Sequence, residues 1–251
     1  MKMDMMNLTG HLGELRKRIM IAMFAFIGAL AATLCYVQQV YGWLTQHLDI
    51  RLALLGPGDI LWVYMMISAV IAAAVTTPVG AYQLWKFVKP ALSAEEHRAA
   101  FRMIPAVSLL FIGGISFGYF IVFPVVSSFL LGLSSGQFQA LYTAEKYFRF
   151  MLNLTLPFGL LFEMPAIVIF LTRLGILNPD RLAKARKTAY FALAVTAVTV
   201  TPPDIVSDVL VVIPLLLLYE CSVSLSRITY RKRLRKLAEE EEREAAVLSG
   251  V

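Results

Sequence analysis

The sequence predicts an all-α integral membrane protein with six transmembrane helices. Three observations support this fold class. Hydrophobic residues make up 59% of the 251 residues and charged residues only 16%, a balance far outside the range of soluble domains. Long apolar stretches recur along the whole chain, and the basic residues between them are unevenly distributed.

Each span is predicted from the length of an apolar stretch. About 20 apolar residues, rising 1.5 Å each, cross a hydrocarbon core of about 30 Å. Six stretches reach or approach that length, namely 19–40, 60–84, 103–131, 147–172, 188–201 and 208–226. The last two are short, because only 16 residues separate Lys187 from Asp204. We expect one membrane domain over 1–226, followed by a charged cytoplasmic tail over 227–251.

The positions of the basic residues predict the topology. Cytoplasmic loops of membrane proteins collect Lys and Arg. If the N-terminus is cytoplasmic, all of the 23 basic residues except Arg51, Lys146 and Arg149 fall on the cytoplasmic side. The pattern predicts a multi-pass membrane protein with both termini in the cytoplasm. The positive charge then reflects topology and anionic lipid, and no nucleic-acid partner is expected.

Signatures of catalysis are absent from the sequence. It contains no HExxH, GxSxG or Walker-type glycine motif, and His11, His47 and His97 lie in separate segments. We therefore expect no enzyme activity, no cofactor and no metal site. Cys35 and Cys221 lie near opposite ends of their spans, so we expect two small buried apolar residues and no disulfide.

Acidic residues inside the spans are the main candidates for function. Glu163 lies between Pro157 and Pro165 in the fourth span, and an ionised acid near the middle of a bilayer costs at least about 2.5 kcal/mol. Asp208 and Glu220 lie in the sixth span, and Asp204 precedes it. These acids could form a proton path, or they could hold helices together through hydrogen bonds. Composition alone does not separate the two hypotheses, and Asp204 and Asp208 could serve either role at the membrane edge.

Two further acidic sites lie in basic cytoplasmic segments. Glu14 precedes the first span, and Glu95 and Glu96 lie between the second and third. Simple structural roles are available, because Arg18 follows Glu14 at i+4 and Ser93 can cap a helix whose first turn holds Glu95 and Glu96. In a functional alternative, the two sites together receive a ligand with adjacent guanidinium groups, which bind carboxylates bidentately.

Five motifs, in order along nearly the whole chain, resemble those of the TatC family, the polytopic subunit of the twin-arginine protein translocase. They are HLGELRKR, FVKPALSAEEHR, FGYFIVFP, FGLLFEMP and TPPDIVSDVLVVIPLLLLYE. The resemblance implies a curved, glove-like bundle of six helices with two short final ones.

It also implies a receptor that reads the paired arginines of an export signal peptide at the cytoplasmic face. With TatA-type single-span partners, and with or without a TatB-type partner, such a receptor exports folded proteins using the proton motive force, as a homo-oligomer within the translocase. By the same resemblance, Glu163 meets a partner helix. The residues implied in signal binding are Glu14, Glu96, Phe87, Pro90 and Leu92, with Glu95 able to share the role of Glu96.

The alternative hypothesis is a proton-coupled small-solute transporter that uses Glu163 and Asp208. Many such transporters contain inverted repeats with paired broken helices in corresponding halves. The sequence shows neither feature, which favours the translocase receptor.

Overall fold

The computed structural model describes residues 2–46, 52–89, 101, 103–134 and 142–248. Regular structure in these residues is helical, apart from one isolated parallel bridge between Ala53 and Thr143. The chain divides into two compact units, Met1–Leu160 and Leu161–Val251, and each is described by itself. The expected single membrane domain over 1–226 stays a prediction.

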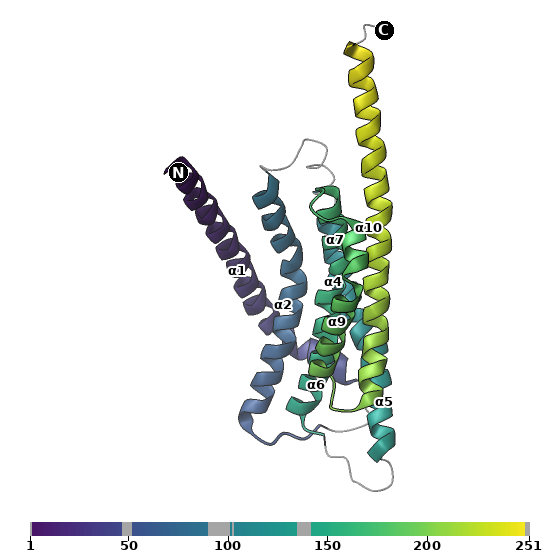
Figure 1. Cartoon of the computed structure of the whole chain (residues 1–251). Helices are drawn as coiled ribbons and strands as arrows, with labels where there is room; N and C mark the ends of the chain where they lie inside the picture. Colours follow the sequence, from purple (N-terminus) through teal and green to yellow (C-terminus); the bar gives the residue numbers. More distant parts are fainter. Residues whose placement is uncertain (1, 47–51, 90–100, 102, 135–141, 249–251) are drawn as a thin grey trace. The chain divides into compact units, whose positions relative to one another are not determined.

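The first unit begins with two long helices, α1 (Lys2–Thr45) and α2 (Pro57–Val88), which contact each other, with α1 crossing α2 at an angle (Figure 1). The next run is continuous and consists of α4 (Met103–Phe117), the π-helix η2 (Gly118–Val122) and α5 (Phe123–Ser134). It is followed by α6 (Ala144–Leu161). These helices contain the first three predicted spans and the first half of the fourth.

The π-helix η2 lies in the middle of the third predicted span. Pro124 follows it and has no backbone N–H, so the regular i→i−4 bonding is interrupted at that position. Gly118, at the start of η2, and Gly159, on α6, pack tightly against their neighbours. A Cβ on Gly118 would lie 2.7 Å from Cα of Thr155, and one on Gly159 would lie 2.7 Å from Cδ1 of Ile115. Small residues thus let α6 approach the third span closely, as in many membrane helix pairs.

The second unit consists of α7 (Met164–Arg173), α8 (Pro179–Lys184), α9 (Arg186–Val200) and α10 (Ile205–Leu248). The predicted fourth span over 147–172 lies within Ala144–Arg173, which is long and apolar enough to cross a membrane. It is interrupted inside the span, because α6 ends at Leu161 and a turn at Phe162 and Glu163 precedes α7. Pro165 lies at the start of α7 and has no backbone N–H, so it cannot donate the i→i−4 hydrogen bond to the carbonyl of Leu161 that a continuous helix would need.

The last two predicted spans differ greatly in helix length. Helix α9 has 15 residues, as short as the sequence predicts. The prediction that the sixth helix is also short is wrong, because α10 has 44 residues and continues past residue 226 without a break; the short stretch between Lys187 and Asp204 limits only α9. Five helices in the described part of the chain are long and apolar enough to cross a membrane, and α9 is not among them. The described part of the structure is therefore that of an all-helical membrane protein with five such helices.

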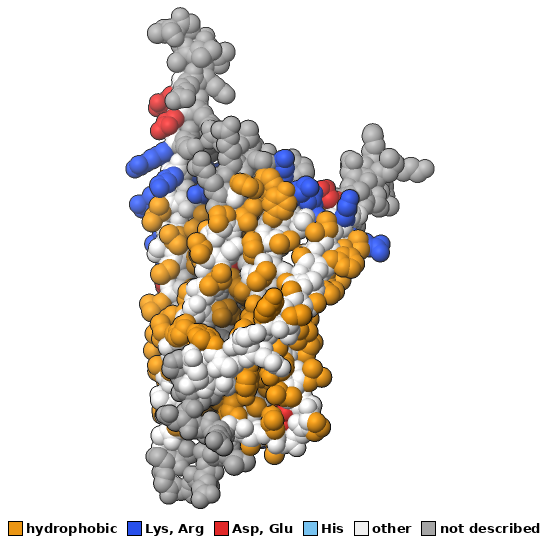
Figure 2. All heavy atoms as spheres, turned by 180° about the vertical axis from the view of Figure 1, so that it is seen from behind, with side chains coloured by type: hydrophobic (Ala, Val, Ile, Leu, Met, Phe, Trp, Pro, Cys, Tyr) orange, Lys and Arg blue, Asp and Glu red, His pale blue; other side chains and the backbone are white. Residues whose placement is uncertain are grey.

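Large hydrophobic side chains are exposed over much of the surface (Figure 2). Phe24 is 72% exposed, Phe191 71% and Ile205 81%. Apolar exposure on this scale indicates contact with lipid, because soluble monomers rarely show extended apolar patches. Cys35 and Cys221 are free, but the prediction that they are buried is wrong, since both lie on exposed helix faces.

Candidate functional site

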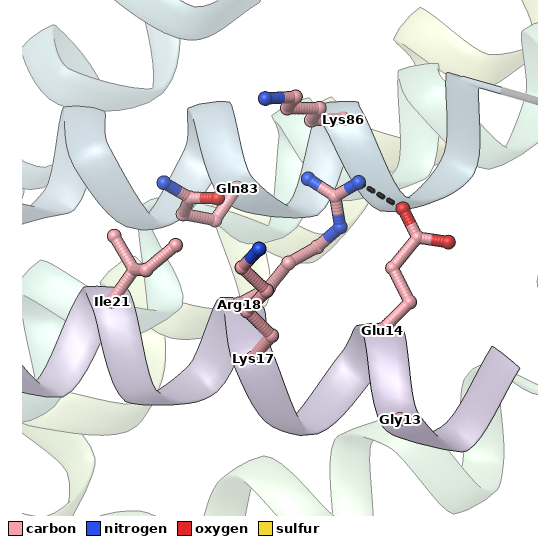
Figure 3. A pocket seen from close by; sticks show the side chains of 7 residues that line it. All are labelled: Gly13, Glu14, Lys17, Arg18, Ile21, Gln83 and Lys86. Carbon is pink, nitrogen blue, oxygen red and sulfur yellow. Dashed lines mark hydrogen bonds and ion pairs between the residues drawn. The ribbon is translucent and has the colours of Figure 1, made fainter. Parts of the chain in front are cut away.

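A pocket of about 360 Å³ lies between α1 and α2 in the first unit (Figure 3). Side chains from both helices line it, with charged groups at one end and an isoleucine at the other. The lining residues are Gly13, Glu14, Lys17, Arg18, Ile21, Gln83 and Lys86.

Glu14 accepts a hydrogen bond from the guanidinium of Arg18, one helical turn further along α1. The i,i+4 spacing in the sequence predicts this ion pair. The Arg18 side chain is only 12% exposed and the Glu14 side chain 39%. Figure 3 shows one Glu14 oxygen directed at Arg18 and the other directed away from it. The carboxylate is therefore reachable, and it already binds a guanidinium.

The other predicted signal-binding residues are only partly described. Phe87 is half-buried near the C-terminal end of α2, the helix that contributes Gln83 and Lys86 to the pocket. The remaining four, Pro90, Leu92, Glu95 and Glu96, lie outside the described residues. The expected meeting of Glu14 with Glu95 and Glu96 stays a prediction.

Glu163 lies in the turn that begins the second unit, immediately before α7. Its backbone carbonyl accepts a hydrogen bond from the Ile167 amide at 3.0 Å, so it starts the hydrogen bonding of that helix. Both carboxylate oxygens are buried. The acid therefore occupies a helix junction rather than the interior of a continuous helix.

Asp204 and Asp208 hold the turn between α9 and α10. Oδ1 of Asp204 accepts a hydrogen bond from the Ser207 amide at 2.7 Å, which caps the start of α10. Oδ1 of Asp208 accepts a hydrogen bond from the Thr201 hydroxyl at 2.5 Å. These contacts give both acids a structural role in the turn.

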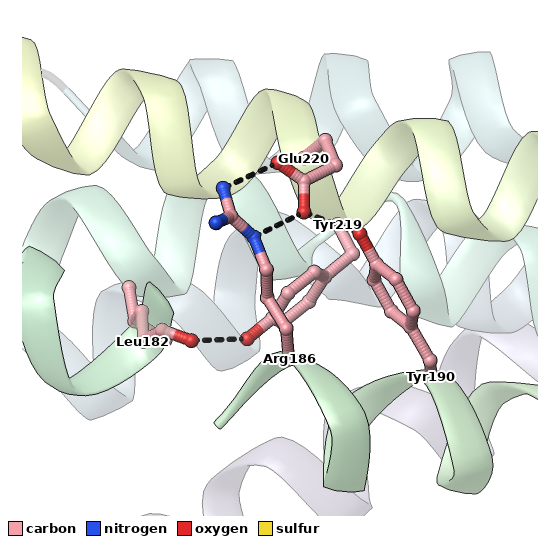
Figure 4. A network of polar contacts seen from close by, with 5 residues as sticks. All are labelled: Leu182, Arg186, Tyr190, Tyr219 and Glu220. Atoms are coloured by element: carbon pink, nitrogen blue, oxygen red, sulfur yellow. Dashed lines mark hydrogen bonds and ion pairs between the residues drawn. The ribbon is translucent and has the colours of Figure 1, made fainter. Parts of the chain in front are cut away.

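Glu220 forms the most extensive polar network in the described part of the second unit (Figure 4). Its carboxylate accepts hydrogen bonds from Nε and Nη2 of Arg186, at 2.7 and 2.8 Å. It also accepts one from the Tyr190 hydroxyl at 2.5 Å, and the neighbouring Tyr219 hydroxyl donates to the Leu182 carbonyl at 2.8 Å. The network ties α8 and α9 to α10, which favours the helix-holding hypothesis for Glu220.

Arg186 was not among the predicted site residues, because the sequence presents it as one of several basic residues in a cytoplasmic loop. It lies 34 residues from Glu220 along the chain. Neither spacing nor periodicity connects residues at that separation. No group of three or more His, Cys, Asp or Glu side chains in the described ranges is placed to hold a metal ion.

The described part of the chain contains long apolar helices and a charged pocket between α1 and α2. These features define an all-helical, multi-pass membrane protein. Comparison with known proteins identifies the family. A family model described as Sec-independent protein translocase protein (TatC) matches residues 10–214. The chain belongs to the TatC family.

Relatives match nearly the full length of the chain. It is 57% identical over 230 residues to the Sec-independent protein translocase protein TatCd of Bacillus subtilis (strain 168), covering 92% of this chain and 95% of that protein. It is 35% identical over 235 residues to TatC of Aquifex aeolicus (strain VF5), covering 91% and 98%. A crystal structure of a protein described as the twin-arginine translocase receptor TatC matches with a TM-score of 0.77 and 34% identity, covering 87% of this chain and 99% of that one.

Proposed function

We propose that this chain, a TatC receptor subunit of the twin-arginine translocase, uses Glu14 to bind one arginine of an export signal. Glu96, with Glu95 able to share its role, binds the second arginine from the adjoining loop. Phe87, Pro90 and Leu92 contribute to the same signal-binding site. The family to which the chain belongs is one of transport proteins rather than enzymes.

The ion pair between Glu14 and Arg18 is the observation that supports this proposal most directly. It provides a carboxylate in a pocket that already accepts a guanidinium. An incoming signal arginine offers the same planar donor group, so it can replace Arg18 at the Glu14 carboxylate. A lysine ammonium lacks the fork of donors and is a poorer substitute.

Binding of a fluorescent signal peptide to the purified protein tests the proposal. We expect the peptide with paired arginines to bind more tightly than the same peptide with paired lysines. Glu14→Gln should weaken binding of the arginine peptide by at least about tenfold, since it removes a charged hydrogen-bond acceptor. Unchanged affinity in Glu14→Gln would reject this site.

The chain offers a matched control for this experiment. Glu145 and Arg149 on α6 form an ion pair with the same i,i+4 spacing, at 2.5 Å, in a different part of the first unit. Glu145→Gln removes the same charge and breaks the same kind of pair. It should leave peptide affinity within about twofold of wild type, a difference of about 0.4 kcal/mol.

We further infer that Glu163 is a docking point for a TatA-type single-span partner, with or without a TatB-type one. Its position in a helix break, with buried oxygens, supports this inference. Polar groups at such breaks form hydrogen bonds across helix interfaces, away from lipid.

The remaining parts of the proposal concern membrane arrangement and energy. Six spans, with α9 as the short fifth one, place both termini in the cytoplasm, which the distribution of basic residues supports. The chain acts as a homo-oligomer within the translocase, in the bacterial plasma membrane, and exports folded cargo with the proton motive force.

A further inference from the structure

The pocket between α1 and α2 has an excess of positive charge. Its lining contains one carboxylate, from Glu14, and three cations, from Lys17, Arg18 and Lys86. Arg18 pairs with Glu14. Neither Lys17 nor Lys86 has an ion pair with any residue in the described part of the chain. The proposed signal contact uses the acid and leaves these cations without a function.

One buried hydrogen-bond donor in the pocket also lacks an acceptor among the described residues. Nε of Arg18 is buried and has no hydrogen-bond acceptor among the described residues. The side-chain amide of Gln83 lines the same space from α2. A buried donor without an acceptor costs free energy, and so does a cluster of like charges. An anion with several oxygens would satisfy both the donors and the charges.

We propose that this pocket binds one phosphate group, carried either by an anionic phospholipid or by a soluble phosphate. The ammonium groups of Lys17 and Lys86 supply the charge, while Nε of Arg18 and the Gln83 amide donate hydrogen bonds to its oxygens. The pocket volume of about 360 Å³ is ample, since a water molecule occupies about 30 Å³ of liquid. The phosphate can therefore enter with part of its hydration shell.

The surface next to the pocket favours the lipid as the source. Immediately after Arg18, α1 exposes a series of large apolar side chains, with Ile19 54% exposed, Met23 55% and Phe24 72%. A lipid whose head group lies in the pocket can place its acyl chains along this surface. Basic pockets between membrane helices at the cytoplasmic side are typical binding sites for anionic head groups.

This site goes beyond the proposed signal binding and does not depend on it. The signal arginines are cations that would bind Glu14, whereas the phosphate is an anion that would bind the lysines. A measurement of lipid binding therefore tests the phosphate site even if signal binding at Glu14 is wrong.

Native mass spectrometry of the full-length protein in detergent, titrated with phosphatidylglycerol, provides the test. The variant Lys17→Gln/Lys86→Gln removes both lysines of the pocket. Each basic residue near an anionic lipid surface contributes about 1 kcal/mol, so the tightest phosphatidylglycerol site should weaken by at least about tenfold.

The matched control is Lys184→Gln/Lys187→Gln, which removes two exposed lysines from the other cytoplasmic loop predicted by the sequence. It should bind within about twofold of wild type, because these lysines do not line the pocket. Phosphatidylcholine should bind weakly to all three proteins. Equal losses in the two double variants, or equal binding of the two lipids, would overturn the proposal.

Inorganic phosphate distinguishes the two sources. If millimolar phosphate displaces the lipid from wild type, the pocket recognises the phosphate group and can take it from solution. If the lipid stays bound, the acyl chains on α1 contribute and the lipid is the source. Either result, together with the lysine dependence, supports the site, and a thermal melt of each variant confirms that it is folded.

Discussion

Gly118 offers a sharp test of how the third span packs in the first unit. It begins η2, and a Cβ at this position would lie 2.7 Å from Cα of Thr155 on α6 and 3.2 Å from its Cβ and carbonyl oxygen. Ordinary contacts of a Cβ are 3.4–4 Å. Backbone atoms cannot rotate away as a side chain can. Gly118→Ala therefore forces the two helices apart.

The expected cost follows from this geometry. Overpacking a tight contact by one methyl group costs about 1–3 kcal/mol, and 1 kcal/mol shifts the melting temperature of a protein of this size by about 2–4 °C. We predict that Gly118→Ala melts about 2–12 °C below wild type. The assay is thermal unfolding of the purified protein in one detergent, followed by circular dichroism.

Gly113, in the same predicted transmembrane span, provides the control. Gly113 on α4 is exposed, and a Cβ there would meet nothing within 4 Å. Gly113→Ala should melt at or slightly above the wild-type temperature, because alanine favours helix over glycine by about 1 kcal/mol. Equal melting temperatures for the two variants would refute the close approach of η2 and α6.

Three further predictions concern the second unit. Glu220→Gln removes the charged acceptor of Arg186, so amide hydrogen exchange should quicken in α9 while Glu145→Gln leaves that helix unchanged. Glu163→Ala should weaken copurification with a TatA-type partner but leave affinity for the signal peptide unchanged. Asp204→Ala removes the cap of α10, at a cost of about 1 kcal/mol, which a thermal melt detects.

Each of these predictions has a result that would contradict it. Unchanged exchange in α9 after Glu220→Gln would mean that the network does not hold the helix. Loss of signal binding before loss of partner binding would place Glu163 at a different step. An Asp204→Ala variant as stable as wild type would mean that the hydrogen bond to Ser207 contributes little.

The transmembrane helices were predictable because the lipid bilayer restricts the length and composition of the helices that cross it. A helix that crosses a membrane must be long and apolar, and α1, α2 and α10 lie where the apolar stretches predict them. The shortness of α9 was also predictable, since Pro202 and Pro203 end it in a tight turn.

Interruptions within the helices were harder to predict. A proline in the sequence indicates that helical hydrogen bonding is altered, but not whether the helix continues, turns or forms a π-helix. Pro78 and Pro157 lie inside unbroken helices, whereas Pro165 follows a short turn at Phe162 and Glu163 and Pro124 follows a π-helix. Packing around each proline decides between these outcomes. Neighbours in the three-dimensional structure are not visible in one sequence.

The candidate site was partly predictable for a similar reason. The pairing of Glu14 with Arg18 follows from helix geometry, because the two residues are one turn apart. The contribution of Gln83 and Lys86 to the same pocket requires the packing of α1 on α2, and the pairing of Arg186 with Glu220 requires the packing of α9 on α10. Those contacts join residues far apart in sequence.

Export in living cells tests the central claim most directly. The host is a bacterium that lacks its own TatC-family gene and carries TatA-type partners. It expresses this chain and a folded reporter behind a twin-arginine signal. We predict that the chain restores export of this reporter, does not restore export of a lysine-pair version, and loses activity in Glu14→Gln. Full export of the twin-arginine reporter without the chain, or equal export of both reporters with it, would contradict its role as the receptor.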